Sequence, residues 1–164
     1  MNRRNMIAAG VASLSAATVT SSKAQKPAES NPELADVKVL LKAHDDAMTG
    51  HDLDGVLATL ADDVAIMGTG PGEMWSGTDE VKVAYEHFFM VFDKGEQDFS
   101  YNFRTGNLGA DMGWMVTSGT VKGKLDSEEF AYPLNVSLTV AKKGGAWKIQ
   151  AMHFSTLTSG EVTA

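Results

Sequence analysis

Residues 51–77, HDLDGVLATLADDVAIMGTGPGEMWSG, place a short helix, a buried strand and a glycine-rich loop directly one after another. Asp52 can cap the helix, and apolar residues then recur at i, i+3, i+4 and i+7, which predicts a two-turn helix with one apolar stripe. The apolar run 64–67 is too short for a helix and ends in glycine and proline, so it predicts a strand followed by a turn. We expect the rest of the chain to pack around this unit.

Two further helices flank the unit in the sequence. Asn31 and Pro32 form a typical helix start, and the apolar stripe that follows contains His44 and runs to Gly50. After the unit, Thr78 can cap a third helix, whose wide aromatic stripe predicts that it is buried.

The second half of the chain predicts strands. From residue 97 the period changes to two, and Phe99, Tyr101 and Phe103 alternate with polar residues, which predicts one aromatic and one polar face. Residues 113–122, 129–141 and 147–155 predict three more strands. Helices gathered on one face of a mostly antiparallel sheet give an α+β domain, and a curved sheet under helices leaves a conical pocket at its open end.

Three motifs resemble one known superfamily. They are DLDGVLATLADDVAI at 52–66, WSG at 75–77 and WKIQAMHFS at 147–155. They resemble bacterial ketosteroid isomerases and the wider SnoaL-like, nuclear transport factor 2-like superfamily, over roughly residues 32–157. The resemblance implies a cystatin-like fold, with three helices on a curved, mostly antiparallel sheet that forms a conical pocket. It also implies a homodimer through the outer face of the sheet.

The resemblance does not extend to the isomerase chemistry. The position of the isomerases' aspartate base falls on Gly68, their oxyanion-hole tyrosine falls on His44, and their second oxyanion donor falls near Pro133. Because neither the base nor the donors are retained, the sequence leaves open whether the chain is an enzyme.

Residues 1–24 differ from the rest of the chain. Arg3 and Arg4 precede a mild apolar run and the small-x-small site at residues 22–24, which predicts a cleaved export signal of the twin-arginine or the general secretory type. We therefore expect a periplasmic or secreted protein. The polar residues 25–30 predict a disordered leader, 31–157 the SnoaL-like domain, and 158–164 a flexible tail.

Charge and cysteine content exclude several classes of function. The 164-residue chain has 14 basic and 21 acidic side chains, and loss of Arg3, Arg4 and Lys23 with the signal would leave 11 basic ones and a net charge of about −10. Nucleic acids and anionic membranes are poor partners for such a chain. The absence of cysteine excludes disulfides and thiolate sites.

Two histidines are the candidate catalytic residues. His44 lies on an apolar helix face, and strict alternation along the last strand places His153 on the inward face with Trp147 and Ile149. Two inward imidazoles could exchange a proton with a substrate. The alternatives are a neutral core histidine at 44, satisfied by one carbonyl, and a structural role at 153.

A set of aromatic and methionine side chains is the candidate lining of an apolar ligand pocket. These residues are Met67, Trp75, Tyr85, Phe89, Tyr101 and Tyr132. The four histidines lack the spacing of zinc ligands, and residues 68–72 lack the lysine of a phosphate loop, so no metal or other cofactor is predicted.

Three functions remain compatible with these patterns. The first is an exported domain that binds a small, largely apolar molecule in its conical pocket. The second is a lyase, isomerase or cyclase in which His44 and His153 perform acid–base chemistry on a carbonyl substrate. The third is a module that acts only through its dimer.

Overall fold

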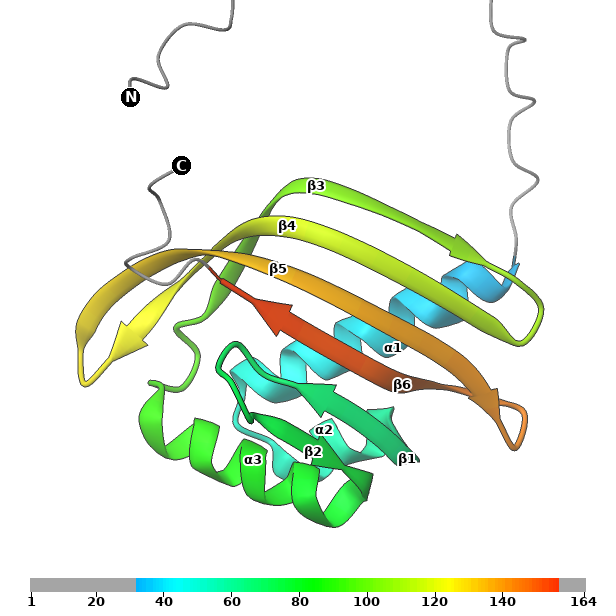
Figure 1. Ribbon diagram of the computed structural model, residues 1–164, viewed down its shortest axis with the longest axis horizontal. Helices are drawn as coiled ribbons and strands as arrows, with labels where there is room; N and C mark the ends of the chain where they lie inside the picture. Colours follow the sequence, from blue (N-terminus) through cyan, green and yellow to red (C-terminus); the bar gives the residue numbers. More distant parts are fainter. Residues whose placement is uncertain (1–31, 157–164) are drawn as a thin grey trace, which may run out of the picture.

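The computed structural model describes residues 32–156, which form three helices on one six-stranded sheet (Figure 1). The predicted export signal at 1–24, the leader at 25–30 and the tail at 158–164 lie outside the described residues. Within 32–156, no helix is both long and apolar enough to cross a membrane. The predicted α+β architecture is confirmed.

The helix–strand unit forms as predicted. The helix α2 (Leu53–Thr59) begins after Asp52, whose carboxylate accepts a hydrogen bond from the backbone N–H of Gly55 at 3.0 Å. It runs directly into β1 (Leu60–Met67), and the fully buried Val56 and Val64 anchor the two elements in the core. The longer helices are α1 (Pro32–Thr49) and α3 (Gly77–Val91).

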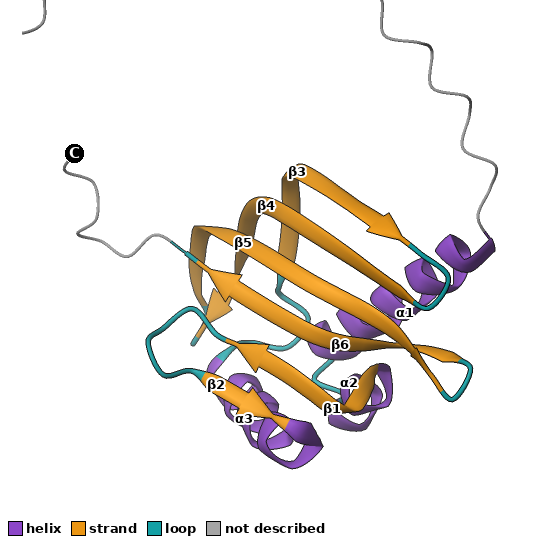
Figure 2. Ribbon diagram, turned by 45° about the vertical axis from the view of Figure 1, so that its right-hand side comes forward, coloured by secondary structure: helices purple, strands orange, loops and turns teal. Residues whose placement is uncertain are grey.

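The sheet has the order β2-β1-β6-β5-β4-β3, and only the pair β1–β6 is parallel. Its remaining strands are β2 (Met74–Ser76), β3 (Asp98–Leu108), β4 (Met112–Leu125), β5 (Glu128–Lys143) and β6 (Ala146–Ser155). The strands β3, β4 and β5 are long and bent, and α1 lies along one side of the sheet (Figure 2). We call this helix-covered side the inner face; Val140, Ile149 and Met152 lie on it and are buried in the core.

Two β-bulges change which face the side chains take. In β3, Tyr101 pairs with Gly119 but Phe103 pairs with Ser118, so Asn102 is an extra residue. Tyr101 therefore lies on the inner face and Phe103 on the opposite, outer face, and the prediction of one continuous aromatic face on this strand is wrong. A bulge adds a residue to one strand, bends it and breaks its alternation.

The second bulge lies in β6. Ile149 pairs with Val140 and Ala151 pairs with Thr139, which leaves Gln150 without a partner position. Strict alternation from Ile149 would place His153 on the inner face, but after the bulge Met152 packs into the core and His153 is exposed on the outer face. The prediction that His153 points inward is wrong for this reason.

Candidate functional site

The inner face carries a buried chain of hydrogen bonds centred on His44. The helix α1 positions this residue at 6% exposure, between α2 and α3. Its Nδ1 lies 2.8 Å from the hydroxyl of Thr59, and its Nε2 lies 3.1 Å from the hydroxyl of Tyr85. The imidazole is therefore satisfied by two hydroxyl groups and not by a backbone carbonyl.

The partner of Thr59 determines the tautomer of His44. The Thr59 hydroxyl donates its single proton to the backbone carbonyl of Val56 at 2.6 Å, so toward His44 it can only accept. The proton of His44 must then be on Nδ1, and Nε2 accepts from the hydroxyl of Tyr85. Burial lowers the pKa of His44 to about 4, so the ring is neutral at pH 7.

An acidic residue of α1 lies near the Tyr85 end of this chain. Asp45 follows His44 on α1 and is exposed, yet the surrounding protein atoms desolvate its carboxyl and, together with Asp46, raise its pKa. Burial is the main cause that raises the pKa of Tyr85, and the charge of Asp45 adds to it; the same two causes act on Tyr101. The carboxylate therefore lies near both phenols.

The inner face of β3 is open next to Asp45. Tyr101 is 50% exposed, the ring of Phe99 packs edge-on against it at 4.8 Å between centroids, and the guanidinium of Arg104 lies 5.0 Å above its ring. Close packing of Phe99 on Gly119 is possible because that residue has no Cβ to meet the ring. Aromatic surface and one cation are thus left uncovered on the side of the sheet that elsewhere forms the core.

The predicted pocket residues do not form one lining. Tyr85 is buried beside His44, and Phe89 is partly buried, 6.0 Å from Tyr85 and stacked on His51 at 4.6 Å between ring centroids. Trp75 is partly buried and packs against the core. Tyr132 is partly buried on the inner face of β5.

Met67 lies on the wrong face for the predicted pocket. Its neighbour Ile66 is buried in the core, whereas Met67 is 41% exposed and pairs with His153 across β1 and β6. The two residues predicted to meet at a conical pocket, His44 and His153, are therefore on opposite faces of the sheet.

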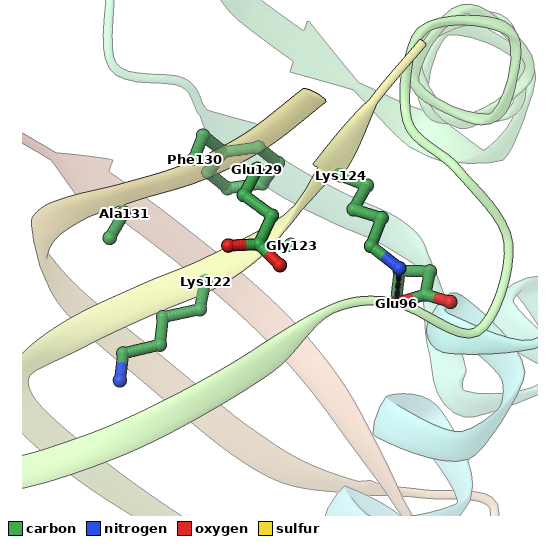
Figure 3. A pocket seen from close by; sticks show the side chains of 7 residues that line it. All are labelled: Glu96, Lys122, Gly123, Lys124, Glu129, Phe130 and Ala131. Atoms are coloured by element: carbon green, nitrogen blue, oxygen red, sulfur yellow. Dashed lines mark ion pairs between the residues drawn. The ribbon is translucent and has the colours of Figure 1, made fainter. Parts of the chain in front are cut away.

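One surface depression lies away from the His44 chain. It has a volume of about 500 Å³ and sits at the β4–β5 hairpin, where Lys124 pairs with Glu96 at 3.0 Å (Figure 3). A second depression, of about 470 Å³, lies between the start of α1 and Trp147. Neither includes a predicted site residue. Among the described residues, no three His, Cys, Asp or Glu side chains gather into a set that could hold a metal ion.

Comparison with known proteins agrees with this architecture. The family model described as a SnoaL-like domain matches residues 37–159. Among curated proteins, none matches the chain.

Three solved structures illustrate the likeness in fold. A nuclear transport factor 2-like protein of unknown function from Pseudomonas putida is 16% identical, with a TM-score of 0.67 over 82% of this chain and 94% of its own. A ketosteroid isomerase-like protein from Erwinia carotovora is 23% identical, with a TM-score of 0.62 over 78% and 98%. A protein provisionally named scytalone dehydratase, from Novosphingobium aromaticivorans, is 14% identical, with a TM-score of 0.66 over 81% and 91%. At these identities the likeness concerns the fold alone.

Proposed function

Because the chain belongs to the SnoaL-like domain family, we propose that it binds a small, largely apolar molecule on the inner face of its sheet, between α1 and β3. The observation that carries the proposal is Tyr101, a large aromatic side chain that is half exposed on the otherwise core-forming face. Apolar surface left open beside a few well-placed polar groups is typical of small-molecule sites.

The polar groups would set the orientation of the ligand. Tyr85 and His44 are neutral at pH 7, and they lie at the buried side of the site. Arg104 and Asp45 lie at its open side. A ligand with an apolar body and one or two oxygen atoms matches this distribution.

The test uses two aromatic residues on the same strand. Replacing Tyr101 with Ser should weaken binding of apolar small molecules, and of a fluorescent apolar dye, at least tenfold. Phe103→Ser is the matched control, because Phe103 is 58% exposed but lies on the outer face. Equal losses in the two variants would contradict a site on the inner face.

Acid–base catalysis of the dehydratase or isomerase type is a second candidate. Its support is Asp45, a carboxyl with a raised pKa that lies near two phenols, since general acids and bases work best when their pKa approaches the working pH. His153, the predicted partner of His44, has no place in this arrangement because it is on the outer face. A substrate can be sought among small molecules that displace the fluorescent apolar dye. Asp45→Asn should abolish turnover of this substrate and change its affinity less than threefold. The control Asp46→Asn should leave both turnover and affinity unchanged.

Assembly as a homodimer is supported by an apolar patch on the outer face. Phe103, Met112 and Trp114 are 58%, 61% and 48% exposed on the paired strands β3 and β4. Light scattering of the purified chain should report twice the monomer mass, and Trp114→Asp should return it to the monomer.

Export to the periplasm rests on residues 1–24. Mass spectrometry of the periplasmic fraction should find a chain that begins at Gln25, and replacement of Arg3 and Arg4 by Lys would block a twin-arginine route but not the general one. An unprocessed chain in the cytosol would contradict the proposal.

A further inference from the structure

Three side chains with potential metal-binding atoms stand in one row across the outer face of the sheet. The antiparallel pair β1–β2 sets Met67 opposite Met74, and the parallel pair β1–β6 sets Met67 beside His153. The row Met74–Met67–His153 therefore spans the strands β2, β1 and β6, with Met67 in the middle. Figure 1 shows these three strands side by side.

The three side chains share the outer face. Their neighbours Trp75, Ile66 and Met152 all pack on the core, and side chains alternate between faces along a strand. Met74 is 67% and Met67 41% exposed, and His153 is exposed as well. Solvent and dissolved ions can reach the whole row.

The spacing of the strands brings the donor atoms within reach of one ion. Adjacent strands lie about 4.8 Å apart, so the outer two Cα atoms of the row are separated by roughly 10 Å. Methionine is unbranched and flexible, which allows the two thioethers to converge above the middle strand. The imidazole of His153 makes no hydrogen bond, ion pair or ring contact with any residue in 32–156, so it is available to turn toward them.

The chemistry of the two thioether sulfurs and the imidazole nitrogen determines which ion this row favours. We propose that Met67, Met74 and His153 bind one monovalent copper ion on the outer face. Thioether sulfur is a soft ligand that favours Cu(I), whereas zinc in proteins takes thiolate, imidazole and carboxylate, and calcium and magnesium take oxygen. The chain has no cysteine that could compete for the ion, and its net charge of −7 favours cations in general.

A competition titration tests the proposal. The full chain is titrated anaerobically, with ascorbate as reductant, against the Cu(I) chelator bicinchoninate. We expect one Cu(I) to be withdrawn per chain, and we expect Met67→Leu and His153→Asn each to weaken the affinity at least tenfold. The controls Met90→Leu, 77% exposed on α3, and His87→Asn, exposed on the same helix, should change it less than twofold.

A second measurement locates the ion independently of affinity. Addition of Ag(I), a redox-inert substitute for Cu(I), should shift the methyl resonances of Met67 and Met74 and the ring resonances of His153, and leave those of Met90 and Met112 in place. Circular dichroism spectra that match the parent confirm that each variant is folded. Failure to withdraw Cu(I) from the chelator, equal losses in the control variants, or shifts at Met90 and Met112 instead would each overturn the proposal.

Discussion

His44 and His153 lie on opposite sides of one sheet, so the same side chain can be compared in a buried and in an exposed environment. His44 is buried, holds its proton on Nδ1 and has a hydroxyl partner on each nitrogen. His153 is exposed and makes no such contact with any described residue. The first environment fixes the ring and suppresses its charge, so it serves packing and orientation; the second leaves the ring free for a ligand.

The largest expected difference between the two histidines is in stability. His44→Ala should lower the free energy of unfolding by about 3–4 kcal/mol, because it opens a cavity, leaves the hydroxyl of Tyr85 without a partner and removes the donor to the hydroxyl of Thr59. His153→Ala should change it by less than about 0.5 kcal/mol, as is usual for an exposed residue. Urea unfolding measures both. Similar losses of stability in the two variants would mean that the difference in burial between the two histidines does not affect the free energy of unfolding.

Protonation of His44 should lower the stability of the folded chain in a defined pH range. Its pKa is about 4 in the folded state and near 6.5 in the unfolded state, so between these values the unfolded chain binds the additional proton. Stability therefore falls as the pH drops from 6.5 to 4, by about 3 kcal/mol from this residue alone. Unfolding curves of the parent and of His44→Gln, compared across this range, isolate the contribution: the variant should lack this part of the decline, and an unchanged slope would contradict the assignment.

Substitution of Thr59 tests which ring nitrogen of His44 carries the proton. Thr59→Val keeps the shape of the side chain but leaves Nδ1–H of His44 without an acceptor, so the free energy of unfolding should fall by about 2 kcal/mol. The nitrogen NMR shifts of His44 should report a proton on Nδ1 in the parent. A proton on Nε2 in the parent would show that the Thr59 hydroxyl donates to the ring and not to the carbonyl of Val56.

Among the changes to the buried hydrogen-bond chain of His44, the smallest expected effect is that of the Tyr85 hydroxyl. Tyr85→Phe removes one hydrogen bond to Nε2 of His44 and should cost about 1 kcal/mol. Its control is Tyr132→Phe, since the hydroxyl of Tyr132 makes no hydrogen bond within the described residues and its loss should be close to neutral. The pKa of His44 should remain low in Tyr85→Phe, because burial and not the phenol is its cause.

The sequence predicts the fold well because its local signals agree with one another. The cap at Asp52, the stripe of α2 and the apolar run of β1 all indicate the same helix–strand unit, and the structure has it. Only the three-residue strand β2 has no counterpart in the predicted strands, since so short a run carries no periodic signal. The inward position of His44 was also predictable, because a helix stripe has no interruption comparable to a bulge.

The site was predicted less well, for two physical reasons. Period-two counting assumes an unbroken ladder, and the extra residues Asn102 and Gln150 reverse the faces of Phe103 and His153. Asp45 was missed because what distinguishes it from Asp46 is its electrostatic effect on Tyr101, 56 positions later in the chain, and helix periodicity carries no information about an interaction between such distant positions.

The bulge at Gln150 also has an evolutionary consequence. Deletion of this one codon would restore strict alternation in β6 and leave Met152 inward and His153 outward, whereas loss of the bulge with Gln150 kept in the ladder would carry His153 to the side of the sheet where His44 lies and move Met152 outward. Gain or loss of a bulge can therefore transfer an intact set of chemical groups between an enclosed and an open surface without a change in chain length. Relatives that share the motif of this strand at the same length but pair it without the bulge would present the same histidine to different molecules.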